Sequence, residues 1–284
     1  MKKALLSIGL GYSASLLARM LLPQGWVIYG TTRMPNRMNV IGKSGVIPLI
    51  FPSSELSNLV EAVDNILVSA APTECGDPVL AVLKDQLEVF GSRLNWVGYL
   101  STTGVYGDHS GNWVDERTSL VPTTDRGKWR QFAEQQWQAI PDLPIHIFRL
   151  AGIYGPGRSP FAKLRYGKSK RIIKKGQVFN RIHVGDIAQV LAASIQRPTP
   201  GEVYNISDDE PAPPQDVIAF AAKLLGIPIP PEICFDEAHL SPMARSFFSD
   251  NKRVSNSRMK KQLNISLLYP NYRIGLRQLF NDGN

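Results

Sequence analysis

The chain has 284 residues, of which 43% are hydrophobic and 20% are charged, and its formal net charge is +8. This composition predicts a globular protein with one large domain and a smaller appendage, and no run of about 18 apolar residues predicts a membrane span. Cys75 and Cys234 lack metal-ligand spacing. We therefore predict no metal site, and two free thiols in a cytoplasmic protein, with a single structural disulfide as the alternative.

The positive charge is densest at residues 163–176, with the sequence KLRYGKSKRIIKKG. An excess of positive charge of this kind can bind nucleic acid, a membrane surface or an anionic small molecule. Because no nucleic-acid recognition motif accompanies the charge, we predict neither a nucleic-acid nor a membrane partner. Two interpretations of the run stay open, a solvated loop and a contact for a phosphorylated ligand.

Short apolar runs rich in β-branched and aromatic residues alternate with amphipathic segments through the first two-thirds of the chain. Such runs predict strands buried on both faces, and the segments between them predict helices. The predicted strands cover residues 3–9, 26–33, 65–72, 96–104, 145–152 and 202–207. The predicted helices cover residues 12–22, 53–63, 77–93, 126–139 and 181–197. The alternation indicates an α/β protein with a Rossmann-type, doubly wound parallel sheet.

Beyond Asp208 the sequence becomes proline-rich, with helices predicted at 214–225 and 252–263. This part does not continue the strand–helix alternation, so we predict a smaller C-terminal lobe on the substrate side. The dinucleotide-binding domain is assigned to residues 1–157 and 181–207. The lobe is assigned to residues 158–180 and 208–284.

The first predicted strand ends in Gly9-Leu10-Gly11-Tyr12-Ser13-Ala14, which fits the pattern G-x-G-x-x-A. Gly9 permits a tight turn, Gly11 lets the backbone approach a pyrophosphate, and Ala14 lets the following helix pack closely. Residues 1–18 also imitate a secretion signal, but their removal would take away the first strand, so we interpret them as strand, turn and helix. The site predicted from this loop also includes Tyr12, Ser13, Ala70 and Ala71. The alternative is a tight turn without a ligand.

The second predicted strand indicates which dinucleotide binds. A site for NAD(H) usually places an acidic residue there to bind the ribose hydroxyl. This chain has Gly30-Thr31-Thr32-Arg33, and no acidic residue follows until Glu55. Hydroxyl and guanidinium groups favour a 2′-phosphate, so we predict NADP(H) in preference to NAD(H), bound by Thr32 and Arg33 with Arg37 as an assistant. As an alternative, Arg33 is a surface residue that stacks on the adenine.

Five segments of the chain form a set of motifs in a fixed order: LSTTGVYGD (100–108), VDERTSLVP (114–122), FRLAGIYGPG (148–157), RIHVGDIA (181–188) and YNISDDEP (204–211). Together they resemble the extended short-chain dehydrogenase/reductase family, the relatives of nucleotide-sugar epimerases and dehydratases. The resemblance covers nearly the whole chain. It implies a Rossmann domain, a nicotinamide cofactor and an active site at the end of the strand over 96–104.

The family's catalytic pair is replaced in this sequence. Where the family has Tyr-x-x-x-Lys, the chain has Arg126 and Arg130, with Pro122 before them and Glu134 at the family's acidic position. Arginine stays protonated, so Arg126 cannot act as a general base. Four residues apart, the two guanidiniums share a helix face and form an anion clamp, with Arg130 also able to bind the nicotinamide ribose. Alternatively, Arg126 pairs with a surface acid and Arg130 with Glu134.

Other polar residues of the motifs have competing interpretations. The resemblance implies that Thr102 binds the reacting oxygen of the substrate, whereas a local interpretation has its hydroxyl bonding nearby backbone. Tyr106 is our hypothesis for a replacement proton donor. His183, between two apolar residues, is interpreted as a semi-buried structural histidine, and Asp186 as a residue that caps or anchors the following helix.

Two functions follow from these residues. The first is an NADP(H)-dependent oxidoreductase or epimerase that acts on an anionic small molecule such as a nucleotide sugar, with Thr102, Tyr106, Arg126 and Arg130 in the active site. The second is a non-catalytic NADP(H)-binding sensor or carrier, which the loss of the tyrosine favours. The resemblance also implies a possible homodimer, with Trp129, Phe132 and Trp137 either on its surface or in the core.

Overall fold

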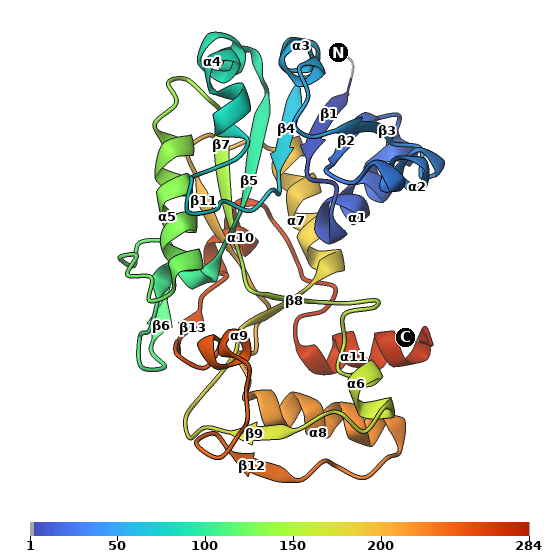
Figure 1. The fold of residues 1–284 in the computed structure, drawn as a ribbon, viewed down its shortest axis with the longest axis vertical. Helices are drawn as coiled ribbons and strands as arrows, with labels where there is room; N and C mark the ends of the chain where they lie inside the picture. Colours follow the sequence, from blue (N-terminus) through green and yellow to red (C-terminus); the bar gives the residue numbers. More distant parts are fainter. Residues whose placement is uncertain (1–2, 284) are drawn as a thin grey trace.

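Seven parallel strands form the central sheet of the computed structural model, which describes residues 3–283 (Figure 1). Their order across the sheet is β11-β7-β5-β4-β1-β2-β3. Their bounds are β1 Ala4–Ile8, β2 Val27–Thr32, β3 Ile47–Ile50, β4 Asn65–Val68, β5 Trp96–Thr102, β7 Ile145–Leu150 and β11 Val203–Ile206. The predicted α/β, doubly wound sheet is therefore confirmed. Only the edge strand β3 was not predicted.

Helices cover both faces of this sheet, as its doubly buried strands require. On one face lie α1 (Tyr12–Leu21) and α7 (Val184–Gln196), whose apolar residues join one core cluster. On the other face lie α3, α4 and α5, with the bounds Glu55–Ala62, Leu80–Phe90 and Asp125–Gln138. Their apolar residues pack with the sheet into a second cluster. The short helix α2 (Met38–Lys43) connects β2 to β3.

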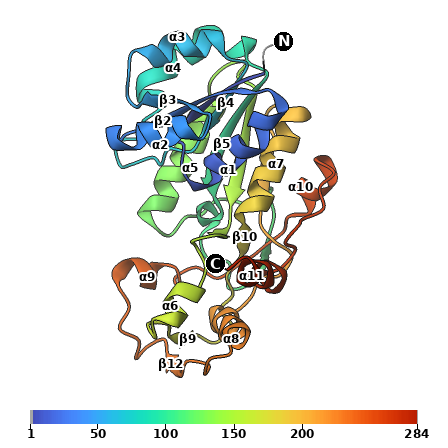
Figure 2. The same cartoon turned by 90° about the vertical axis from the view of Figure 1, so that its right-hand side faces the viewer.

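A smaller lobe lies beyond the carboxyl ends of the sheet strands (Figure 2). Its elements are β8 Gly152–Tyr154, α6 Phe161–Arg165, β9 Arg171–Ile173, β10 Arg181–His183, α8 Pro214–Leu225, β12 Glu232–Cys234, α9 Pro242–Ser246 and α11 Tyr272–Asn281. Helices α6, α8 and α11 share an apolar core of their own. Short parallel ladders join β8 to β10 and β9 to β12.

After the lobe has formed, the chain returns to the main domain. Strand β13 (Arg253–Val254) pairs in parallel with β6 (Trp113–Val114), and helix α10 (Ser257–Gln262) follows. Met259, Leu263 and Ile265 are buried in the core cluster of α1 and α7. The predicted assignment of this segment to the lobe is therefore wrong, and so is the predicted helix start at 252, because a strand precedes α10.

Candidate functional site

The glycine loop after β1 is held by the neighbouring strands. Gly9 has a φ of 90°, and a Cβ added there would lie 3.0 Å from Ser69 Oγ and 3.2 Å from the Ala70 nitrogen. The Gly9 N–H donates to Thr31 Oγ1 at 2.8 Å. Positive φ and close backbone approach both select glycine. The sequence analysis did not assign this positioning role to Thr31, although it lies two residues before Arg33.

Helix α1 begins in open space above this turn. Gly11 is its N-cap, no side chain caps the helix, and its first turn holds no acidic residue. A Cβ added to Gly11 would meet nothing closer than the Gly9 carbonyl oxygen at 3.9 Å. Ser13 and Ala14 are buried against the core. Uncapped N–H groups at an accessible helix N-terminus suit a pyrophosphate, so these residues fit a dinucleotide.

The end of β2 carries the groups predicted to select the cofactor. Thr32 is buried, and its hydroxyl accepts from the Met34 N–H at 3.1 Å. Arg33 and Arg37 are exposed, and neither side chain forms a hydrogen bond or ion pair with another residue between 3 and 283. Both guanidiniums are thus available to a phosphate. Their contact with a cofactor, and the alternative of stacking on adenine, stay predictions.

Tyr12 links the glycine loop to the lobe. Its hydroxyl donates to the Pro156 carbonyl at 2.8 Å, and the Arg158 guanidinium lies 4.3 Å from the centre of its ring. The tyrosine is half-buried, and this burial raises its pKa. Tyr12 therefore connects the predicted cofactor site with the rim of the cleft described next.

A cleft of about 710 Å³ lies between the carboxyl ends of β5 and β7 and the lobe. The predicted residues that line it are Thr102, Arg126 and Arg130. The charged residues that line it are Arg126, Arg130, Arg158, Arg181, Lys252 and Asp250. Five cations against one carboxylate favour an anionic ligand. The sequence analysis missed Arg158 and Arg181, although each lies in or beside a quoted motif, and it missed Lys252, which has no motif.

Thr102 lies at the end of β5 and on the cleft wall. Its hydroxyl accepts from the Gly104 N–H at 3.1 Å and so caps the one-turn 3-10 helix Thr103–Tyr106. The local hydrogen bond predicted as the alternative is present. It uses the oxygen as an acceptor and leaves the hydroxyl proton for another partner.

Arg126 and Arg130 diverge. The Arg126 guanidinium donates to Ser246 Oγ at 3.1 Å and lies 5.7 Å from the centre of the Phe247 ring, both in the lobe. Arg130 points back to the sheet, donating through Nη1 to the Leu100 carbonyl at 2.8 Å and to the Tyr99 hydroxyl at 3.1 Å. The two groups therefore do not converge as a clamp in this structure. The predicted surface-acid partner of Arg126 is also wrong.

Glu134 binds a different arginine. Its carboxylate accepts from Arg149 Nη2 at 2.8 Å and from Ser101 Oγ, and both charged side chains are buried. The predicted pair between Arg130 and Glu134 is therefore wrong. The pair that exists ties α5 to β7 behind the cleft.

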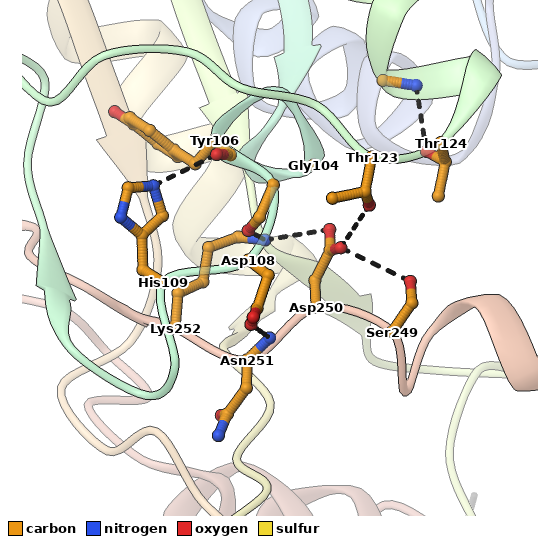
Figure 3. Close-up of polar contacts among 12 residues, drawn as sticks. Gly104, Tyr106, Asp108, His109, Thr123, Thr124, Ser249, Asp250, Asn251 and Lys252 are labelled. Carbon is orange, nitrogen blue, oxygen red and sulfur yellow. Dashed lines mark hydrogen bonds and ion pairs between the residues drawn. The ribbon is translucent and has the colours of Figure 1, made fainter.

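Tyr106 does not face the cleft, and the hypothesis that it replaces the proton donor is wrong. The residue is fully buried. Its hydroxyl donates to Asn205 Oδ1 at 2.8 Å and accepts from Arg149 Nη1 at 2.9 Å. Burial raises its pKa. Figure 3 shows its ring pointing away from the cleft residues Asp250 and Lys252, across the loop that carries Gly104 and Asp108.

His183 and Asp186 hold the joint between lobe and sheet. His183 is buried, and its Nδ1 accepts from the Gly185 N–H at 3.1 Å, which caps α7. Burial lowers its pKa to about 4, so it is neutral at pH 7 and does not line the cleft. The Asp186 carboxylate accepts from the N–H groups of Leu268 and Tyr269 at 2.7 and 3.1 Å. Asp186 therefore anchors the C-terminal segment, whereas we had predicted that it caps or anchors the helix that follows it.

The remaining predicted surfaces lie away from the cleft. The cleft lining includes no residue of the basic run 163–176; it has Arg158 before the run and Val178 after it. On α5, Trp137 is a core residue, while Phe132 is 53% exposed. Over residues 3–283 no helix has the length and apolarity to cross a membrane, and no grouping of three or more His, Cys, Asp or Glu side chains could hold a metal ion.

Comparison with known proteins gives relatives along nearly the whole chain. A functionally unknown conserved protein from Silicibacter pomeroyi is 60% identical, with a TM-score of 0.96 over 99% of both chains. Protein YeeZ of Escherichia coli is 29% identical over 81% of this chain and 86% of its own. A proposed NAD-dependent epimerase/dehydratase from Methylobacillus flagellatus is 27% identical, with a TM-score of 0.76 over 100% of this chain and 99% of its own. No family model matches.

More distant solved structures share the fold. A dTDP-glucose 4,6-dehydratase from Bacillus anthracis, solved with NAD, is 18% identical with a TM-score of 0.79 and covers 98% of this chain and 96% of its own. The human epimerase family protein SDR39U1, solved with NADPH, is 15% identical with a TM-score of 0.75 and covers 98% of this chain and 99% of its own. Proteins of this architecture thus hold either dinucleotide.

Proposed function

We propose that the chain is a member of the extended short-chain dehydrogenase/reductase family, which its likeness to an NAD-dependent epimerase/dehydratase supports, and that it binds NADP(H) and transfers hydride to or from an anionic small molecule such as a nucleotide sugar. One observation carries the proposal. An uncapped glycine loop that fits a dinucleotide lies next to a cleft that five cations and one carboxylate line. The family's members bind NAD or NADPH, and the preference for NADP(H) rests on the exposed Arg33 and the absence of an acid at the end of β2.

Each residue has a part in this proposal. Gly9, Gly11 and the first turn of α1 hold the pyrophosphate through backbone N–H groups. Ala70 and Ala71 flank the loop after β4, and Arg130 lies beside them at the nicotinamide end, since its Nη1 lies 3.5 Å from the Ala70 carbonyl oxygen. A bound nicotinamide would supply or accept the hydride. Thr102 donates a hydrogen bond from its hydroxyl to the reacting oxygen and keeps its proton.

Lobe and main domain share the binding of the anion. Arg126 comes from α5, whereas Arg158 and Arg181 come from the lobe, and all three line the cleft. Guanidinium groups bind phosphate and carboxylate oxygens in pairs. We also expect a cytoplasmic protein, because both cysteines are exposed and free. A homodimer through α5 would cover the exposed Phe132.

The test is an equilibrium titration with NADPH and NADH, followed by dihydronicotinamide fluorescence. Wild type should bind NADPH at least tenfold more tightly. Arg33→Ala removes a charge-assisted contact worth about 1.5–3 kcal/mol, so NADPH affinity should fall about 10- to 100-fold, with NADH unchanged. Arg93→Ala, an exposed arginine at the opposite end of the sheet, is the matched control. Equal affinity for both cofactors would refute the NADP(H) preference.

A second function has one observation in its favour. Arg126 occupies the position of the family's tyrosine, and the buried Tyr106 does not replace it, which favours a sensor or carrier that binds NADP(H) without turnover. Incubation of the protein and NADPH with aldehydes, ketones and nucleotide sugars separates the two. Loss of dihydronicotinamide absorbance supports the enzyme. Tight NADPH binding with no loss against the whole panel supports the sensor.

A further inference from the structure

The cleft needs a proton donor, and few of its side chains can titrate. Its four arginines stay charged at any relevant pH. The remaining titratable residues that line it are Tyr154, Asp250 and Lys252. Tyr154 directs its hydroxyl into the lobe, towards the Asn271 carbonyl at 3.4 Å and against Gly275 of α11. This leaves the Asp250–Lys252 pair.

Lys252 lies on the cleft wall just before β13, at 6% exposure. Its ammonium donates to the Gly107 carbonyl at 2.7 Å and to Asp250 Oδ2 at 3.3 Å (Figure 3). An ammonium has three N–H donors, and the third has no partner among residues 3–283. The lysine therefore reaches the loop that follows Thr102 and keeps one donor unused.

The surroundings hold this ammonium in place. Asp250 also accepts from Thr123 Oγ1 and, at 3.4 Å, from Ser249 Oγ. Asp108, on the loop facing the lysine, accepts the Asn251 N–H at 2.7 Å. Burial lowers the pKa of Lys252, while Asp250 and Asp108 oppose that shift. The charged groups facing the lysine are thus the carboxylates of Asp250 and Asp108, which favour its protonated form against the effect of burial.

We infer, on the basis of the function proposed above, that Lys252 gives the proton to the reacting oxygen of the substrate, in place of the family's tyrosine. In the reduction of a carbonyl, hydride from a bound nicotinamide would add to the carbonyl carbon. The π electron pair moves to the oxygen, an N–H bond of Lys252 breaks, and an O–H bond forms. Lys252 is left as a neutral amine and regains its proton from water. In the oxidation of an alcohol, the neutral amine takes the hydroxyl proton.

Lys252→Arg tests this role, because arginine keeps the charge and the donors for Gly107 and Asp250 but does not titrate. General acid–base catalysis contributes about 10²–10⁴-fold, so turnover of a carbonyl substrate should fall at least about 100-fold. The limb of the wild-type pH profile that reports the lysine should vanish, while NADPH affinity stays within twofold. Lys174→Arg is the matched control, since Lys174 also donates to a lobe carbonyl, that of Phe248, and does not line the cleft.

The second readout needs no turnover. In protein labelled with ¹³C at lysine Cε, the resonance missing from the Lys252→Arg variant identifies Lys252, and its titration should fall below that of the other lysines. Titration together with the surface lysines, or turnover by Lys252→Arg close to wild type, overturns the inference. A wild type that binds NADPH but turns over nothing also overturns it and leaves the sensor function. A wild type that binds no NADPH refutes the proposed function itself.

Discussion

Asp208 shows how a single buried carboxyl group can make the stability of the fold depend on pH. It is 2% exposed, one oxygen accepts from the Glu210 N–H at 3.2 Å, and the other has no partner among residues 3–283. Burial raises its pKa to about 8, although the charge of Arg181 opposes the shift. The folded protein therefore keeps this group protonated at pH values where the unfolded chain has lost the proton.

Asp208→Asn mimics the protonated form. The neutral carboxyl stabilises the fold fully below the unfolded pKa, near 4, and this contribution is lost as the pH rises towards 8. Each pKa unit corresponds to about 1.4 kcal/mol. As the pH rises from about 5 to about 8, we therefore expect the free energy of unfolding of the variant to increase by about 2–4 kcal/mol relative to that of wild type. Urea unfolding of both proteins across this range measures it. Parallel pH profiles would contradict the prediction.

At the scale of elements, helix α5 depends on one buried ion pair. Thr124 caps the helix by accepting from the Gly127 N–H at 3.2 Å. Ten residues further on, Glu134 binds Arg149 of β7 at 2.8 Å, with 2% and 7% of the two side chains exposed. Two charges removed from water in this way depend on each other, because either one alone would be buried without compensation.

Glu134→Gln should cost about 3–5 kcal/mol of unfolding free energy, since it leaves the Arg149 charge unpaired. The double variant Glu134→Gln/Arg149→Met should recover part of that loss. Lys128→Gln breaks only the exposed pair with Asp125 and should stay within about 0.5 kcal/mol of wild type. Thermal unfolding of the four proteins is the measurement. A double variant less stable than Glu134→Gln alone would contradict the argument.

Over the whole molecule, apolar residues form separate cores. The sheet has one on each face, and the lobe has its own, which includes Tyr272, Leu276 and Leu279 of α11. Between the lobe and the sheet lies the cleft, lined by polar and charged side chains from both. The lobe core can therefore weaken without a loss of packing in the sheet.

Leu276→Ala tests the independence of the two parts. Leu276 is 1% exposed, and its truncation should cost about 2–5 kcal/mol. Hydrogen exchange should show lost protection in α8 and α11, with β1 and β4 protected as before. Leu268→Ala, at a residue that is 61% exposed, is the control and should change little. Equal loss of protection in β4 and α11 would show that lobe and sheet unfold as one unit.

Sequence reasoning succeeded where the signal was local. Each predicted apolar run contains a strand, because doubly buried parallel strands need continuous apolar residues. Strand β3 was missed because it is four residues long, contains Pro48 and lies at the sheet edge, where proline is tolerated. Helix α11 (Tyr272–Asn281) was also missed, and no element had been predicted after residue 263.

The candidate site was predictable only where its residues follow predicted strands. The glycine loop and Thr102 follow strand ends, so their positions came from the strand pattern. Tyr106 was misplaced because the 3-10 turn Thr103–Tyr106 rotates its ring into the core. Lys252 could not be found, since only the return of the chain along β6 brings it to Gly107, 145 residues away in sequence.

The pairing of β13 with β6 also has a consequence for synthesis of the chain. All seven sheet strands have left the ribosome once residue 206 has emerged, and domains generally fold as units during translation. The wall that Lys252 and β13 supply arrives later, after the whole of α8 and α9. A nascent chain halted after residue 206 and before α9 would hold all seven sheet strands and the glycine loop but would lack Ser246, Phe247, Asp250 and Lys252 of the cleft lining. On the proposed function, cofactor binding would thus precede substrate recognition in the life of each molecule.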